Sequence, residues 1–233
     1  MTGSRVGFRM RRFLRDNGLT LFFAAIFLAA LVGQSFAGHA AYDQVRISEG
    51  LSEVSYWSYV TSSSFATDVA ENWQSEYLQF FLYIAATVWL IQRGSPESKK
   101  PGQAGPESDQ EERVGRFARP DPPPPAAAEG LRRVLFSHSL LIVMGSVFLL
   151  SWAAQSVAGV ISFNEQQIID LQTPYTWGEY ALSSEFWNRT LQNWQSEFLA
   201  VGSMAALSIF LRERGSTESK SVGAAHSDTG TNT

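Results

Sequence analysis

The chain of 233 residues contains no cysteine and only three histidines. Without cysteine the protein has no disulfide bond, no thiolate nucleophile and no thiolate metal ligand. The histidines, His39, His138 and His226, do not form a metal-ligand pattern. We therefore expect no metal ion, no cofactor and no redox chemistry.

Catalytic arrangements are lacking as well. The sequence offers no Ser/His/Asp set, no glycine-rich phosphate loop and no paired carboxylates on a soluble surface. We expect that the protein is not an enzyme and has no catalytic residue. We also expect no nucleic-acid partner.

The two halves of the chain carry the same sequence blocks at a constant spacing of 121 residues. The block Asn-Trp-Gln-Ser-Glu at 72–76 recurs unchanged at 193–197, Gln-Ser-x-Ala-Gly at 34–38 recurs at 155–159, and Arg-Gly-Ser-x-Glu-Ser-Lys at 93–99 recurs at 214–220. Three blocks in one register indicate an internal duplication.

Each repeat contains two apolar stretches. They are 19–33 and 77–91 in the first repeat, and 140–154 and 198–211 in the second. The second stretch of each repeat is shorter than the roughly 20 helical residues needed to cross the hydrocarbon core. Aromatic residues spaced three or four apart precede each of them, which predicts that the second helices begin upstream, near Ser64 and Ser184. Gly94 and Gly215 are expected to end them.

The first apolar stretch, together with its basic leader, also fits a signal peptide. Its duplicate lies in mid-chain, where no signal peptide can be, so we interpret both copies as retained membrane helices. The predicted fold class is an all-α membrane protein with four transmembrane helices, arranged as two tandem helix-pair repeats of the same orientation.

The basic residues predict the orientation. Of the 18 lysines and arginines, 16 lie in the leader, in the segment 93–133 or at 212–220, and only Arg46 and Arg189 lie between paired helices. The positive-inside rule then places both termini and the linker in the cytoplasm.

The predicted organisation has five parts. They are a basic cytoplasmic leader at 1–15, a first repeat at 16–93, a disordered proline-rich linker at 94–130, a second repeat at 131–214 and a disordered tail at 215–233. Each repeat includes an outer aromatic segment between its two helices. The linker and tail have the polar composition of solvated tethers.

Four repeated polar residues form the candidate site. Counted from the basic residues at the cytoplasmic ends, Gln34 and Glu76 lie at one level, roughly 25 to 29 Å above that boundary at about 1.5 Å per residue. The same count applies to Gln155 and Glu197. A carboxylate at this depth needs a donor, so we expect Gln34 to pair with Glu76 and Gln155 with Glu197 in the bundle interior.

Two interpretations of these pairs remain open. In the first, the pairs fasten helices together, Trp73 and Trp194 anchor their helices at the membrane interface, and the protein has a structural or interaction role. In the second, Glu76 and Glu197 line a polar cavity through which a small solute, ion or proton permeates. The unbroken helices weaken the second interpretation.

The blocks Arg-Phe-Leu-Arg-Asp-Asn-Gly-Leu at 12–19, Val-Gly-Gln-Ser at 32–35 and the second Asn-Trp-Gln-Ser-Glu block with its continuation to Gly202 carry a resemblance. Over residues 11–221 the chain resembles an uncharacterised bacterial integral-membrane family, a domain of unknown function. The resemblance implies a bacterial inner-membrane location and no particular activity. The expected partners are the lipid bilayer and, in addition, a second copy or another membrane protein.

Overall fold

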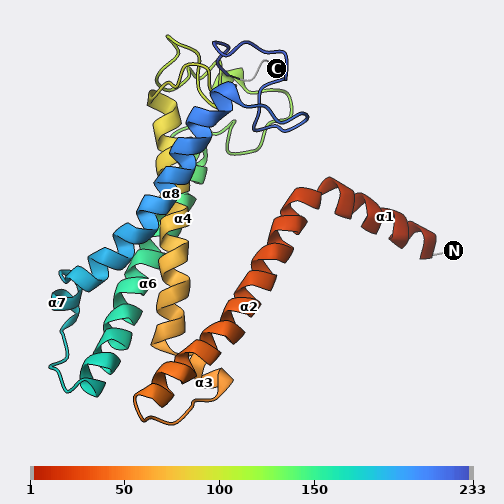
Figure 1. Ribbon diagram of the computed structural model, residues 1–233. Helices are drawn as coiled ribbons and strands as arrows, with labels where there is room; N and C mark the ends of the chain where they lie inside the picture. The colour runs from red at the N-terminus through yellow and green to blue at the C-terminus, as the bar shows by residue number, and fades with distance from the viewer. Residues whose placement is uncertain (1–2, 231–233) are drawn as a thin grey trace.

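The structure is a computed structural model that describes residues 3–230. Within this range every regular element is a helix and no strand occurs, so the all-α prediction is confirmed there (Figure 1). The helices are α1 (Gly3–Asp16), α2 (Gly18–Ser48), α3 (Tyr56–Val60), α4 (Ser63–Trp89), the 3₁₀ helix η1 (Gly115–Phe117), α5 (Leu131–Ser137), α6 (Ser139–Ile169), α7 (Trp177–Ala181) and α8 (Ser184–Phe210). Positions 1–2 of the predicted leader and 231–233 of the predicted tail lie outside the described residues.

Two of these helices are long and apolar enough to cross a membrane. They are α2 and α6, each of 31 residues. At about 1.5 Å per residue such a helix is roughly 46 Å long, more than the thickness of the hydrocarbon core. Both the first and the last residue of α6 lie 121 positions after those of α2.

Of the four predicted membrane helices, α4 and α8 do not meet this criterion. Each has 27 residues, so length is not the reason. Their first halves carry charged and amide side chains that interrupt the apolar sequence. These side chains include Asp68, Glu71, Asn72, Gln74 and Glu76 in α4, and Glu185, Arg189, Gln192, Asn193, Gln195 and Glu197 in α8.

The predicted starts of α4 and α8 are confirmed to within one residue, whereas their predicted ends are wrong. Ser62 and Ser183 cap the two helices by accepting hydrogen bonds from the backbone N–H groups three residues later. At the other end, the chain becomes extended at Leu90 and Leu211, so no glycine cap forms. Gly94, with a φ of +89°, instead forms a turn in the following loop.

Helix α4 is the centre of the arrangement. It packs along α6 and crosses α8, whereas α2 packs on the short helix α3. Figure 1 shows α2 leaving the bottom of α4 and diverging from it, and α1 continuing away from the other three long helices. The extended helix–helix packing within residues 3–230 is therefore formed by α4, α6 and α8.

The short helices α3 and α7 form two similar aromatic corners. Tyr180 of α7 is 1% exposed and packs on Phe163 and Phe186, with its hydroxyl against Gly159 of α6. Tyr59 of α3 is also buried, and its hydroxyl lies against a glycine of α2. Each corner fixes the position of one long helix relative to the next, α2 relative to α4 and α6 relative to α8.

The distribution of apolar side chains is the reverse of that in a water-soluble bundle. The contacts between helices bury small and polar side chains such as Thr67, Gln74, Gln155 and Thr190. Large apolar side chains point outward along the long helices, and only 6% of the most apolar part of α2 is buried. Such a surface covers far more than the isolated apolar residues found on most soluble proteins.

Candidate functional site

A charged cluster joins α4 to α8. Arg189 of α8 donates from Nε to Glu71 at 3.0 Å and from Nη2 to Asp68 at 3.2 Å. Asn193, one turn further along α8, donates to the other oxygen of Glu71 at 2.7 Å. Both oxygens of the buried Glu71 carboxylate thus accept hydrogen bonds from α8. These bonds fix the position of α4 along α8.

A second polar contact lies about one helical turn after the charged cluster along α4 and α8. The indole N–H of Trp194 donates to Oε1 of Gln74 at 2.8 Å, and Gln74 is fully buried. The Trp194 ring also packs on Trp152 of α6, with centroids 5.9 Å apart. Trp194 was predicted as an anchor at the membrane interface, and the structure gives it in addition a place in the contact between helices.

The predicted partners Gln34 and Glu76 come to one groove. The groove has a volume of about 680 Å³ and lies between α2 and α4, where Trp73 and Phe27 also line it. Trp73 is 42% exposed and its ring lies 6.3 Å from that of Phe27. Among the described residues neither Gln34 nor Glu76 has a hydrogen-bond partner, so the groove brings them together without joining them.

Gln155 and Glu197 are not brought together as a bonded pair. Gln155 is fully buried on α6, and within the described residues neither of its amide atoms has a hydrogen-bond partner. Glu197 lies partly exposed on α8. The helix pairing explains the difference, because α6 packs mainly along α4 and its aromatic contacts with α8 are made by Trp152.

Glu197 instead lies within electrostatic range of Glu76. These two carboxylates are 121 positions apart, as are Asp68 and Arg189 in the charged cluster. The part of the chain that the structure describes contains no group of three acidic, histidine or cysteine side chains suited to hold a metal ion.

The sequence interpretation missed Arg189, Asp68 and Glu71. It counted Arg189 only as one of two basic residues outside the cytoplasmic segments. A signal was present, because Asp68 and Arg189 occupy the same position of the two repeats with opposite charges. Equivalent positions meet where a twofold axis passes between two helices, so opposite charges there favour a direct ion pair.

The loops that follow α4 and α8 have matching turns. In the first, Ser98 accepts from the backbone N–H of Gln92 at 2.8 Å, and in the second Ser219 accepts from Glu213 at 2.9 Å. The two loops meet at Glu97, which accepts from the Tyr83 hydroxyl and lies beside the Glu218 carboxyl. Burial, and next the neighbouring Glu218 carboxyl, raise the pKa of Glu97, so Glu97 holds a proton more readily than an isolated glutamate does.

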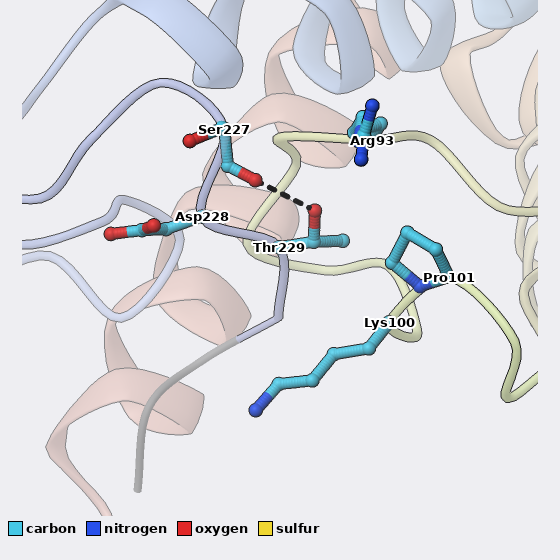
Figure 2. Close-up of a pocket in the computed structure, with 6 residues that line it drawn as sticks. All are labelled: Arg93, Lys100, Pro101, Ser227, Asp228 and Thr229. Carbon is cyan, nitrogen blue, oxygen red and sulfur yellow. Dashed lines mark hydrogen bonds between the residues drawn. The ribbon is translucent and has the colours of Figure 1, made fainter.

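A small cavity of about 330 Å³ lies between the first of these loops and the end of the chain. Figure 2 shows its lining residues, with Thr229 at the centre, where its hydroxyl donates to the backbone oxygen of Ser227 at 3.2 Å. The same hydroxyl accepts from the N–H of Gly94 at 2.8 Å. Arg93 and Lys100 point in different directions in Figure 2, so the two cations do not converge on one ligand position.

The comparison with known families covers nearly the whole chain. The family described as a domain of unknown function, DUF6766, matches residues 10–231. The chain belongs to this family. The DUF6766 match agrees with the resemblance to an uncharacterised family seen over residues 11–221. No curated protein and no solved structure matches the chain.

Proposed function

We propose that this DUF6766 chain is an integral membrane protein with a structural or interaction role. The observation that supports it is the reversed burial: helices meet through small and polar side chains, and the large apolar ones point outward. Interfaces between helices in lipid are rich in small and hydrogen-bonding residues, because lipid tails solvate leucine and phenylalanine as well as a protein core does.

The proposal includes four membrane crossings in two tandem repeats. Helices α2 and α6 are the more apolar crossings, and α4 and α8 cross beside them with their polar halves turned toward one another. The matching helix boundaries and the pairs Asp68–Arg189 and Glu76–Glu197 support a pseudo-twofold axis that passes between α4 and α8. The positive-inside rule supports cytoplasmic termini, and the sequence resemblance supports a bacterial inner membrane.

The structural role is favoured because the charged groups in the interior already have partners within the protein. Arg189, Glu71 and Asn193 satisfy one another across the contact between α4 and α8. A charged residue that binds and releases a permeating solute has to be free of such fixed hydrogen bonds. We accordingly propose a protein without catalytic activity that fastens membrane helices and presents them to other proteins.

A second candidate is the permeation of an ion, proton or small solute past Glu76 and Glu197. One observation favours it: Glu76 lines the 680 Å³ groove between α2 and α4 together with Gln34. Ionisable residues at membrane depth often mark such pathways.

Topology reporters test the proposed placement. Fusions after Gln92 and after Gly130 should report the cytoplasm, and fusions near Gly50 and Gln172 should report the opposite side. The physical reason is that 16 of the 18 basic residues lie in the leader, in the segment 93–133 or at 212–220. A linker found outside, or a fusion at Gly50 and one at Gly130 on the same side, would rule out the paired crossings.

A further inference from the structure

The contact between α4 and α6 provides a template for a second, unfilled contact. The two helices approach each other closely at both ends of this contact. The hydroxyls of Ser64 and Ser162 are 2.9 Å apart, and the Phe81 ring lies 3.0 Å from where a side chain on Gly145 would begin. Between them, Thr67, Glu71, Gln74 and Leu78 continue one stripe along α4, and all four are buried. Glu71 and Gln74 of this stripe are also hydrogen-bonded to α8.

The corresponding stripe of α8 is uncovered. Moving each residue of the α4 stripe by 121 positions gives Glu185, Asn188, Gln192, Gln195, Leu199 and Gly202. Every one of these six is exposed. In this structure the side-chain amides of the three Asn and Gln residues have no hydrogen-bond partner, and in hydrocarbon such groups are costly.

Helix α2 carries the face that fits this stripe, but it lies elsewhere in this chain. The counterparts of Gly145, Gln155 and Ser162 of α6 are Ala24, Gln34 and Ala41 of α2, which keep small side chains around one glutamine. Figure 1 shows α2 diverging from α4 and lying apart from α8.

Three contacts fasten α2 to the segment of α3. The Ser35 and Tyr56 hydroxyls are 2.8 Å apart, His39 lies 2.8 Å from the Val54 oxygen, and Asp43 accepts from the Val54 N–H at 2.9 Å. These contacts hold the outer half of α2 in its present direction. For α2 to pack on α8 of the same chain, α2 would have to change direction and break these three contacts.

We propose that the exposed stripe of α8 binds α2 of a second copy of this chain, as α4 binds α6 within one chain. In a dimer with a twofold axis, each chain places its α2 on the α8 stripe of the other chain, so that both stripes are covered. The new contact continues an interface already present, because Gln192 and Ser196 adjoin Asn193, through which α8 packs on α4. Exchange of an identical element between copies forms such dimers at low cost. The inference rests on the proposed membrane placement.

Disulfide crosslinking in native membranes tests this dimer, since the chain has no cysteine of its own. The template pair Ser64 and Ser162 becomes Glu185 and Ala41 in the new contact. Ala41→Cys and Glu185→Cys are placed on two differently tagged copies that are expressed together. The expected result is a species of twice the chain mass that carries both tags and disappears on reduction.

Two further variants separate the outcomes. One chain with Ser64→Cys and Ser162→Cys should form a disulfide at monomer mass, and its failure would overturn the helix arrangement from which both proposals are drawn. With that control positive, the absence of any mixed-tag species overturns the dimer alone. A chain carrying both Ala41→Cys and Glu185→Cys that closes only at monomer mass would show that α2 covers its own α8, which also overturns the dimer.

Discussion

At the scale of the residue, the pair of Arg189 with Asp68 and Glu71 is the contact most specific to this chain. It joins α4 to α8 through two ion pairs and lies beside the buried Gln74. Removal of Arg189 leaves the buried Glu71 carboxylate without its counter-charge, whereas exchange of the charges at 68 and 189 keeps the attraction between those two positions.

We expect Arg189→Ala to lower the free energy of unfolding in detergent by about 1 to 3 kcal/mol, the usual contribution of hydrogen bonds to charged groups. The double variant Asp68→Arg with Arg189→Asp should recover part of the loss, because the 68–189 attraction is kept while the new carboxylate at position 189 faces Glu71. Thermal unfolding followed by circular dichroism measures both effects. Arg46→Ala is the control, because Arg46 is only partly buried and its hydrogen bond goes to the nearby Ser52 oxygen rather than to another long helix, so its effect should stay within about 0.5 kcal/mol. A double variant no better than the single ones would show that the ion pair does not hold the helices.

At the scale of the element, the close approach of α7 to α6 fixes the corner that returns the chain into α8. A side chain added at Gly159 would begin 2.5 Å from the Tyr180 hydroxyl and 3.0 Å from its ring. Tyr180 has no free space to move into, because it is 1% exposed. Glycine is therefore required here by packing rather than by backbone conformation.

We expect Gly159→Ala to destabilise the protein by about 1 to 3 kcal/mol, since overpacking forces the tyrosine or the backbone to shift. Adding Tyr180→Phe should restore part of the loss because it removes the nearest atom. Gly33→Ala in α2 provides the matched control: nothing lies within 4 Å of its added carbon, so helix propensity should make it neutral or stabilising by up to about 1 kcal/mol. Equal effects of the two alanine substitutions would contradict the packing argument.

At the scale of the whole molecule, the structural and the permeation interpretations differ in flux. We expect liposomes containing the purified protein to conduct protons and monovalent cations no faster than protein-free liposomes. The double variant Glu76→Gln with Glu197→Gln should behave alike and remain folded, because an amide keeps the shape of the carboxylate. Flux by the unmodified protein that the double variant abolishes would replace the structural role with permeation.

Much of the local structure follows from the sequence alone. Each of the four long helices covers most of a predicted apolar stretch, although α2 and α6 continue past positions 33 and 154 to Ser48 and Ile169. Ser62 and Ser183 begin α4 and α8 close to the predicted residues. These features depend on the spacing of apolar residues and on capping groups, which act within a few residues along the chain. The helix ends were harder to predict, because an extended Leu90 and a glycine cap at Gly94 are both compatible with the same local sequence.

The partner of each helix was decided only by the tertiary structure. Gln155 was predicted to pair with Glu197, yet it is buried on α6 without a hydrogen-bond partner among the described residues, and Arg189 lies against Asp68 and Glu71. Repetition at a spacing of 121 residues tells which positions are equivalent but not which of them touch. Contact between equivalent positions requires an axis between α4 and α8, and the location of that axis is set by how the helices pack along their whole length.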